Sequence, residues 1–229
     1  MKLLAEYLTK LNIPFDQDTI QKFEIYYDLL IEYNKMFNLT SITEKNEVIV
    51  KHFVDSLYGY NYFKDISKAV DVGAGAGFPS IPLAIVLPNV KWTLVDSLNK
   101  RVNFLNVVAE KLQLNNVTAI HSRVEDFCSK NRNSFDVATA RAVASLPTLL
   151  EYLIPLVKKG GKAICYKSTN IDNELLISNN AFNKLKCSLE EKFDYFLEDN
   201  FRSLVFIKSL DLCPSIYPRG GNKPKIKPL

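Results

Sequence analysis

The chain has 229 residues, which is enough for one well-buried domain with a small extension. Its composition, 47% hydrophobic and 24% charged, is that of a globular protein, and its net charge of +4 permits a nucleic-acid partner without requiring one. The four cysteines form no C-x-x-C pair and their spacing suggests neither a disulfide framework nor a zinc site, while the presence of only two histidines excludes a histidine-rich metal centre.

The N-terminal segment lacks the features of a targeting sequence. Glu6 and Lys10 interrupt the apolar core that a secretory signal would need, and no apolar run approaches the length of a transmembrane helix. Together with the unpaired cysteines, this predicts a cytoplasmic protein with neither membrane contact nor a bound metal.

Residues 1–60 are predicted to form a helical extension. Between Ile20 and Phe37, apolar residues recur at spacings of three, four and seven, which is the stripe of an amphipathic helix. A second helix is predicted over Glu47–Tyr58, with Asn46 as its N-cap.

Strands and helices alternate through residues 61–210, which predicts an α/β fold with a mostly parallel, doubly wound sheet. Two further strands between Phe193 and Ser209, joined near Asp199-Asn200, predict an antiparallel hairpin at one sheet edge. In chain order, the preceding elements are predicted as strands at 69–72 and 91–96, a helix at 98–114, strands at 117–121 and 135–140, a helix at 145–157 capped by Ser145, and a strand at 162–167 after the Gly160-Gly161 turn.

The segment 211–229 is predicted to be a basic C-terminal tail. Its last eleven residues contain Arg219, Lys223, Lys225 and Lys227 and no acid, while three prolines and a glycine pair are expected to prevent regular structure. Two interpretations stay open: a disordered tail, or a basic arm that binds RNA phosphates or folds onto the substrate.

A glycine-rich turn follows the first predicted strand, with the sequence Asp71-Val72-Gly73-Ala74-Gly75-Ala76-Gly77-Phe78-Pro79. Ligands of doubly wound sheets bind outside the carboxyl ends of the strands, and Gly73 and Gly75 allow the backbone to approach a ligand closely. Phe78 stands where a dinucleotide-binding loop has its third glycine. The turn instead resembles the first motif of class I methyltransferases, which binds S-adenosylmethionine; the alternative is a tight turn without a ligand.

Two further positions complete a predicted adenosine site. Asp96 ends the next strand, 23 residues after Gly73, where a carboxylate can accept hydrogen bonds from ribose hydroxyls or cap the following helix. The stretch Ser122–Phe127 follows the third strand, beside the adenine position of this fold, where Val124 can pack on the face of the ring.

Several longer blocks narrow the family. Besides the turn, they are Tyr33–Thr40, His52–Leu57, Asp96–Arg101, Ser122–Glu125, Ala140–Ser145, Tyr217–Arg219 and Lys227–Leu229. With these blocks the chain resembles, over essentially its whole length, the family of 16S rRNA guanine-527 N7-methyltransferases, also called glucose-inhibited division protein B. The N-terminal blocks and the block around Arg141 are far more specific than the turn.

The resemblance implies a class I, Rossmann-like S-adenosylmethionine methyltransferase. Its partner would be 16S rRNA, in the small ribosomal subunit or an assembly intermediate, and we expect a monomer. The resemblance also implies cofactor contacts at Gly73, Phe78, Val124, Glu125 and Arg141. The reasoning from the residues adds Gly75 and Asp96 to this set.

The expected chemistry requires few catalytic groups. Guanine N7 carries an in-plane lone pair and loses no proton, so its methylation needs alignment more than a general base. The fourth strand is followed neither by the N/D-P-P-Y/F sequence of amino-group methyltransferases nor by a cysteine for attack on a pyrimidine, and we predict no catalytic residue. Arg141 is expected to hold the cofactor carboxylate or RNA as a fork, with a surface ion pair to Glu125 or Asp126 as the alternative.

Other basic and aromatic residues are candidates for RNA contact. Arg123, Lys100 and Lys167 lie near predicted strand ends and are candidate phosphate contacts, with ordinary solvated surface as the alternative. A guanine that presents N7 must be unstacked, and Phe78 or Tyr166 is a candidate to stack on it.

Three other functions compete with this one. They are methyl transfer to another RNA or a small molecule, nicotinamide-dependent oxidoreduction, and RNA binding without catalysis. The basic tail and N-terminal helices argue against a small-molecule substrate, Phe78 in place of the third glycine argues against a nicotinamide enzyme, and the intact glycine turn argues against a non-catalytic module.

Overall fold

The computed structural model describes residues 1–141, 144–169 and 171–229, which form two compact units. The N-terminal unit comprises residues 1–67 and 74–121, and the C-terminal unit comprises residues 68–73 and 122–229. This division cuts across the predicted segments 1–60, 61–210 and 211–229, which stay a prediction. No helix in the described ranges is both long and apolar enough to cross a membrane.

The N-terminal unit contains the predicted amphipathic helix as α2 (Gln17–Phe37). The Asp16 carboxylate caps its first turn by accepting from the Thr19 amide at 2.8 Å, and it ends at Asn38 in the left-handed conformation. Phe23, Tyr26 and Leu30 of its apolar side are buried in the packing with neighbouring helices, whereas Ile20 and Phe37 near its ends are half-buried. The other helices of this unit are α1 (Lys2–Lys10), α3 (Lys45–Val48), α4 (Asp55–Leu57), α5 (Tyr60–Phe63), α6 (Ser80–Val86) and α7 (Asn99–Lys111).

The second predicted helix exists but starts earlier than expected. A π-helical stretch, Ile49–Val54, joins α3 to α4, so the helical path runs from Lys45 to Leu57. The N-cap is Glu44, whose carboxylate accepts from the Glu47 amide at 2.8 Å. The prediction of Asn46 as the cap was therefore wrong: the Glu44 side chain, two residues earlier, satisfies a free amide of the first turn.

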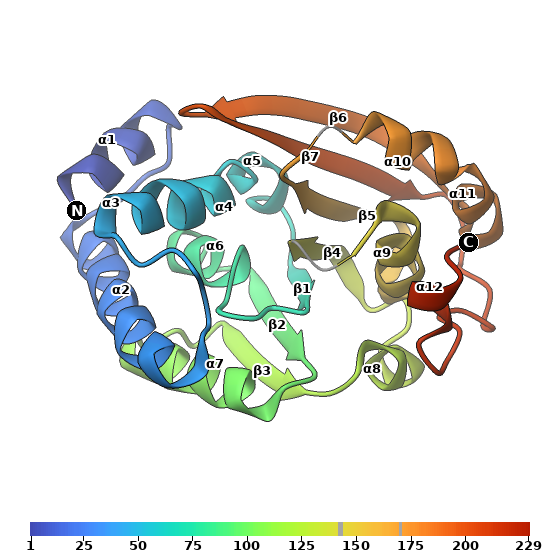
Figure 1. Ribbon diagram of the computed structural model, residues 1–229, viewed down its shortest axis with the longest axis horizontal. Coiled ribbons are helices and arrows are strands. Elements are labelled where there is room, and N and C mark those ends of the chain that lie inside the picture. The colour runs from blue at the N-terminus through green and yellow to red at the C-terminus, as the bar shows by residue number, and fades with distance from the viewer. Residues whose placement is uncertain (142–143, 170) are drawn as a thin grey trace. The chain divides into compact units, whose positions relative to one another are not determined.

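Two strands of the N-terminal unit pair in parallel. They are β2 (Lys91–Asp96) and β3 (Val117–His121), with Asp96 opposite His121, and both match the predicted bounds. The connecting helix α7 packs against both strands, and α6 packs against β2 (Figure 1).

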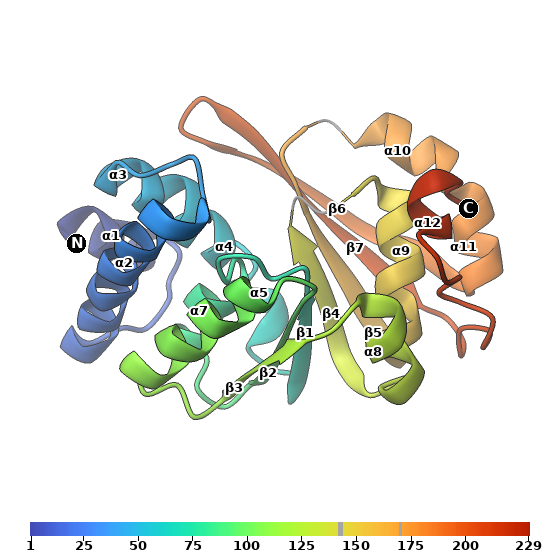
Figure 2. The same cartoon turned by 60° about the horizontal axis from the view of Figure 1, so that its bottom comes forward.

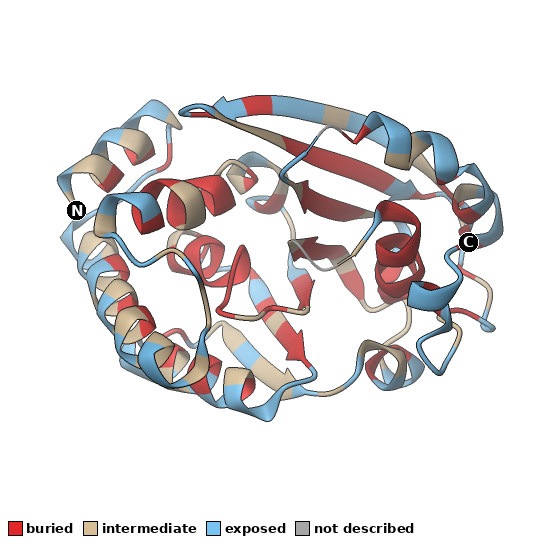
Figure 3. Ribbon diagram, in the orientation of Figure 1, coloured by how far each residue is buried: buried red, intermediate tan, exposed pale blue. Residues whose placement is uncertain are grey.

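The described residues of the C-terminal unit form five strands, and the central ones are deeply buried (Figure 3). Three of the strands run parallel, and the last two form the predicted antiparallel edge hairpin. The first strand of this hairpin starts at Cys187, before the predicted Phe193. The charged run Glu190–Lys192 gives no apolar strand signal in the sequence, because its charges are paired on the surface of the strand. In spatial order the strands are β1 (Lys68–Val72), β4 (Phe135–Arg141), β5 (Val157–Lys167), β7 (Asn200–Ser209) and β6 (Cys187–Leu197).

Helix α9 (Leu146–Leu153) is the buried centre of the C-terminal unit (Figure 3). It packs against β4 and β5, while α11 and α12 pack against α9 (Figures 1 and 2). Ser145 occupies its N-cap position as predicted, but the first free amide, that of Leu146, is bound by the Glu174 carboxylate instead. The helix tightens into a 3₁₀ turn at Ile154–Leu156 rather than continuing to Val157.

The remaining helices of this unit are α8 (Val124–Lys130), α10 (Asp172–Ile177), α11 (Asn179–Leu185) and α12 (Lys223–Ile226). Helix α12 shows that the tail is ordered, so the expectation that its prolines and glycines prevent regular structure was wrong. Pro224 is buried and fits the first turn of this helix, where no backbone amide is required, and the terminal Leu229 is only 8% exposed.

Candidate cofactor site

The glycine-rich turn leads from β1 to α6 and has three glycines in the left-handed region, at φ 71° for Gly73, 59° for Gly75 and 96° for Gly77. A Cβ on Gly77 would lie 2.6 Å from Ile81 Cγ1 and 2.9 Å from Tyr26 Oη. Gly77 is therefore required by close packing inside the N-terminal unit as well as by its backbone angle. The Tyr26 hydroxyl donates to the Ala76 carbonyl and fixes the turn against α2.

Asp96 at the end of β2 holds the same turn. Its Oδ2 accepts from the Gly75 amide at 2.9 Å, and its Oδ1 accepts from the Leu98 amide at 2.9 Å. The Arg101 guanidinium lies 3.4 Å from Oδ2, and Asp96 is only 3% exposed. A carboxylate offers about four acceptor positions, and three donors already contact this one. Asp96 thus supports the turn before α7, but Leu98 is the N-cap residue of that helix and no side chain caps it, so the helix-cap alternative was wrong.

Phe78 lies among aromatic side chains of the N-terminal helices. Its ring stacks on His52 at a centroid distance of 4.6 Å and lies 5.5 Å from Tyr26. His52 Nε2 is in turn 2.8 Å from Thr40 Oγ1. The blocks Tyr33–Thr40 and His52–Leu57 therefore buttress the glycine turn, a role that no local pattern in the sequence signals.

The predicted stacking of a target guanine on Phe78 or Tyr166 is not favoured by burial. Phe78 is 6% exposed and Tyr166 is 3% exposed, whereas a base-stacking platform needs an open ring face.

The C-terminal unit carries the other predicted cofactor residues. Gly73 follows β1 and Arg141 ends β4, and these two strands are parallel neighbours with Asp71 opposite Thr139. Both residues therefore stand at the carboxyl ends of adjacent strands, where such sheets bind ligands. Arg141 is half-buried and registers with Tyr166 of β5, while residues 142 and 143 of its block lie outside the described residues.

Val124 and Glu125 form the first turn of α8, with Arg123 at the N-cap position. Val124 and Glu125 are half-buried, so each retains accessible surface, and Arg123 is exposed. This arrangement leaves one apolar and one acidic side chain at the start of a helix that follows β3 in the chain.

The three predicted phosphate contacts have different surroundings. Arg123 and Lys100 are exposed, and the Lys100 ammonium lies 5.9 Å from the centre of the Phe37 ring. The Lys167 side chain is only 10% exposed, and its ammonium donates to the Glu174 carboxylate at 2.8 Å and to the Ala144 carbonyl at 3.1 Å. Lys167 therefore stabilises the fold, which makes it the weakest of the three candidates.

The four cysteines are free thiols and all are buried. Burial raises the pKa of Cys128, Cys165 and Cys187 to about 12 and that of Cys213 to about 11. A thiol becomes a nucleophile only as its thiolate, so none of the four is prepared for covalent catalysis. Within the described ranges, no group of three or more histidine, cysteine or acidic residues is arranged to hold a metal ion.

Comparisons with known proteins agree with this geometry. A family model described as rRNA small subunit methyltransferase G matches residues 19–204. The protein named ribosomal RNA small subunit methyltransferase G in Clostridium botulinum (strain Alaska E43) is 43% identical, with 99% of this chain and 98% of that protein covered. Its namesake in Bacillus subtilis is 42% identical, with 97% of this chain and 95% of that protein covered.

The similarity to solved structures concerns the fold. The precorrin-6y C5,15-methyltransferase of Geobacter metallireducens aligns with a TM-score of 0.52 at 15% identity, covering 69% of this chain and 87% of that one. With the parallel strands of both units, this confirms the predicted Rossmann-like methyltransferase class, including its antiparallel edge.

Proposed function

The chain belongs to the family of rRNA small subunit methyltransferase G and is a methyltransferase, and from this premise we propose that it methylates N7 of guanine 527 in 16S rRNA, with S-adenosylmethionine as the methyl donor. The family match over residues 19–204 carries the proposal. The finer choices, of the cofactor, the nucleotide and the ring atom, extend what the family name says.

The residues of the N-terminal unit fit an adenosine-containing cofactor. S-adenosylmethionine supplies an activated sulfonium methyl group when bound. Asp96 is a buried carboxylate, a group suited to a ribose hydroxyl, and it fixes Gly75 in a turn whose backbone can lie close to a ligand. We assign binding of the ribose to Asp96 and binding of the amino-acid part to the turn at Gly73 and Gly75. The buried ring of Phe78 would support this turn from within the protein.

The family resemblance implies three further cofactor contacts, and we assign a role to each. Val124 and Glu125 are accessible at the start of α8 and would bind the adenine, the first by apolar packing and the second by its polar groups. Arg141 would hold a carboxylate or a phosphate with its guanidinium fork. No side chain needs to act as a general base, because N7 of guanine loses no proton when it is methylated.

The four buried thiols support this chemistry over attack on a pyrimidine. Methylation of C5 of a pyrimidine would need a thiolate, and burial keeps the cysteines in the neutral form. A nitrogen with a free lone pair needs only to be aligned with the methyl group, which a rigid turn and an arginine fork can provide.

The proposed partner is 16S rRNA within the small subunit or an assembly intermediate. We propose that the protein binds it as a monomer in the cytoplasm. Arg123 and Lys100 are exposed cations suited to phosphates. Lys167 stays in the proposal only as a secondary contact, since Glu174 already neutralises it.

The proposal is tested with small ribosomal subunits from a strain that lacks this modification. They are incubated with labelled S-adenosylmethionine and the protein, and the labelled nucleotide is mapped by mass spectrometry. Label on N7 of guanine 527 is expected. Label on another nucleotide would overturn the site, and cofactor binding without label in subunits, precursor particles or free 16S rRNA would overturn the substrate.

A further inference from the structure

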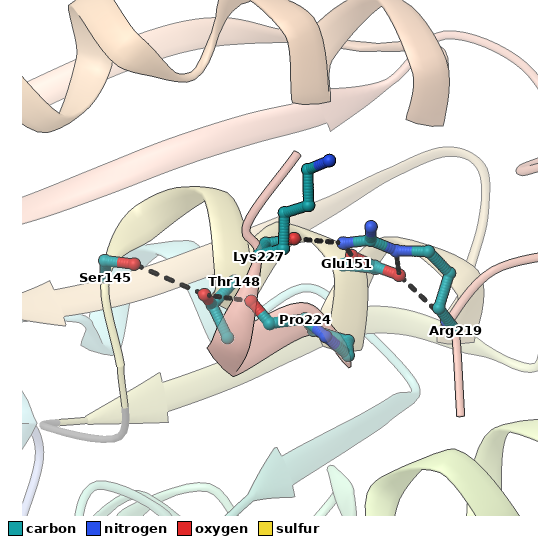
Figure 4. A network of polar contacts seen from close by, with 6 residues as sticks. All are labelled: Ser145, Thr148, Glu151, Arg219, Pro224 and Lys227. Carbon is teal, nitrogen blue, oxygen red and sulfur yellow. Dashed lines mark hydrogen bonds and ion pairs between the residues drawn. The ribbon is translucent and has the colours of Figure 1, made fainter. Parts of the chain in front are cut away.

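The C-terminal tail is fixed to helix α9 by an ion pair inside the C-terminal unit (Figure 4). Glu151 of α9 is fully buried, and its two carboxylate oxygens accept from Nε and Nη2 of Arg219 at 2.8 and 2.7 Å. The Arg219 amide donates to the same carboxylate at 2.8 Å. These hydrogen bonds raise the pKa of Arg219, and the Glu151 carboxylate compensates the positive charge of this residue, the only arginine in the tail.

Further hydrogen bonds hold the short helix α12 in place (Figure 4). The Thr148 hydroxyl donates to the Pro224 carbonyl at 2.8 Å, and Arg219 Nη2 donates to the Lys227 carbonyl at 2.8 Å. Arg132 donates to the carbonyls of Cys213 and Pro214 at the entry to the tail. A helix of four residues is not stable by itself in water, so its order is imposed by these contacts.

Lys223, Lys225 and Lys227 are the exposed cations of this ordered segment. Within the described ranges none of their ammonium groups meets an acidic side chain, and residues 212–229 contain no acid at all. Among the described residues of the same unit, acids pair with Lys158, Lys159, Lys162, Lys167, Lys186, Lys192 and Lys208, whereas Lys130 and Lys184 stand without such a partner but are not clustered.

The uncompensated charge is unfavourable for the free protein. Lys223 and Lys225 lie within α12 and Lys227 is the residue that follows it, so three like charges fall within five residues and repel one another. A bound anion would remove this repulsion, and the contacts that hold α12 mean that little further ordering is needed on binding.

We propose that Lys223, Lys225 and Lys227, held on α9 through the Arg219–Glu151 ion pair, form a binding site for the phosphate backbone of the RNA substrate. This inference rests on the proposed function and assigns to the tail a share of substrate binding rather than of chemistry. The free basic arm considered from the sequence is replaced by a preorganised cationic segment.

The test replaces all three lysines with glutamine, in the variant Lys223→Gln, Lys225→Gln, Lys227→Gln. For methyl transfer to unmodified small subunits, we expect KM to rise about tenfold with kcat unchanged, since each exposed ion pair contributes up to about 1 kcal/mol. The slope of log affinity against log salt should become shallower by about 2, as expected for three lost phosphate contacts.

A matched variant controls for net charge. Lys10, Lys111 and Lys184 are also exposed, and their replacement by glutamine removes the same charge at other places. This control should keep the KM and the salt slope of the unchanged protein, and both variants should keep their affinity for S-adenosylmethionine. Equal losses in both variants would overturn the proposal, because the effect would then be one of net charge.

The remaining outcomes separate this inference from the proposed function. If the unchanged protein modifies the subunits and the tail variant does so with the same KM and salt slope, the tail site is refuted while the function stands. If the tail variant instead loses only binding to phosphatidylglycerol vesicles, the lysines serve a lipid surface and the RNA assignment is refuted. Absence of transfer by the unchanged protein contradicts the function itself.

Discussion

The Gly75 amide donates to Asp96 Oδ2 across 2.9 Å, and this bond ties the glycine-rich turn to the end of β2. The turn is thereby fixed through a residue that also accepts from the Leu98 amide at the approach to α7. One buried carboxylate thus sets the shape of the loop and faces the position that we assign to the ribose. In the proposed site, support of the turn and binding of the ribose therefore depend on the same residue.

The variant Asp96→Asn tests this coupling. Asparagine has one acceptor oxygen in place of two, so either the Gly75 or the Leu98 amide loses its partner. An unsatisfied buried donor costs about 1–3 kcal/mol. We expect the dissociation constant for S-adenosylmethionine, measured by calorimetry, to rise at least about tenfold, which corresponds to ~1.4 kcal/mol.

Asp136→Asn is the matched control, because Asp136 also accepts from a backbone amide, that of Lys68, and pairs with Lys158. It should leave the cofactor affinity unchanged. An Asp96→Asn protein that binds the cofactor as tightly as the unchanged protein would remove Asp96 from the site.

Arg141→Lys tests the assignment of the fork. Lysine keeps the positive charge but cannot donate two parallel hydrogen bonds to a carboxylate or phosphate. We expect kcat/KM for methyl transfer to fall about thirtyfold, or ~2 kcal/mol, the contribution of a hydrogen bond to a charged group. Loss of thermal stability with unchanged transfer would favour the alternative, a structural ion pair.

Local patterns in the sequence predict much of this fold. The alternation of apolar residues places β2 and β3 at their observed bounds, and the run from Asp71 to Pro79 predicts a turn at a strand end. Both signals lie within a few neighbouring residues, so they do not depend on tertiary contacts.

Contacts between distant segments are what the sequence could not predict. The stacking of His52 on Phe78 joins residues that no periodicity connects, and it turns a candidate base-stacking ring into buried core. The order of the tail likewise depends on the ion pair between Glu151 and Arg219. In the sequence, Glu151 is an ordinary helix residue, and nothing near it indicates this distant partner. The prolines and glycines of the tail disfavour regular structure locally, but the ion pair outweighs this local preference.

Gly77→Ala is predicted to destabilise the N-terminal unit. Its Cβ would lie 2.6 Å from Ile81 Cγ1, and its φ of 96° is strained for any side chain. Strain and overpacking cost about 1–3 kcal/mol each, so we expect the free energy of unfolding to fall by about 3 kcal/mol. Gly220→Ala is the control, since a Cβ there meets nothing within 4 Å, and it should be neutral in the same denaturant titration.

Glu151→Gln is predicted to loosen the tail. The substitution leaves the Arg219 guanidinium without its buried counter-charge. Breaking a fully buried ion pair costs about 3–5 kcal/mol. The cost is smaller here because the Arg219 side chain is 26% exposed to solvent. We expect a loss of about 2 kcal/mol in stability and faster hydrogen exchange in residues 219–229. Slow exchange throughout the tail of this variant would show that the remaining contacts suffice.

The cysteines provide a last prediction, which concerns pH. Burial favours the neutral thiol, so the unfolded chain ionises these groups near the ordinary pKa of 9 while the folded chain holds the protons of Cys128, Cys165 and Cys187 up to about 12. Between these values the folded state binds more protons than the unfolded state. Stability should therefore be unaffected by the thiols below pH 9 and should decrease as the pH rises toward 12.

Alkylation of the native protein at pH 8 measures the same property. A pKa of about 12 in place of 9 lowers the thiolate fraction of Cys128, Cys165 and Cys187 about a thousandfold, and a pKa of about 11 lowers that of Cys213 about a hundredfold. Iodoacetamide should therefore modify the native thiols very slowly and all four at an ordinary rate in guanidinium. Methyl transfer should survive the reagent under native conditions. A single native cysteine that reacts rapidly, with loss of transfer, would contradict the argument from burial and revive covalent attack on a pyrimidine.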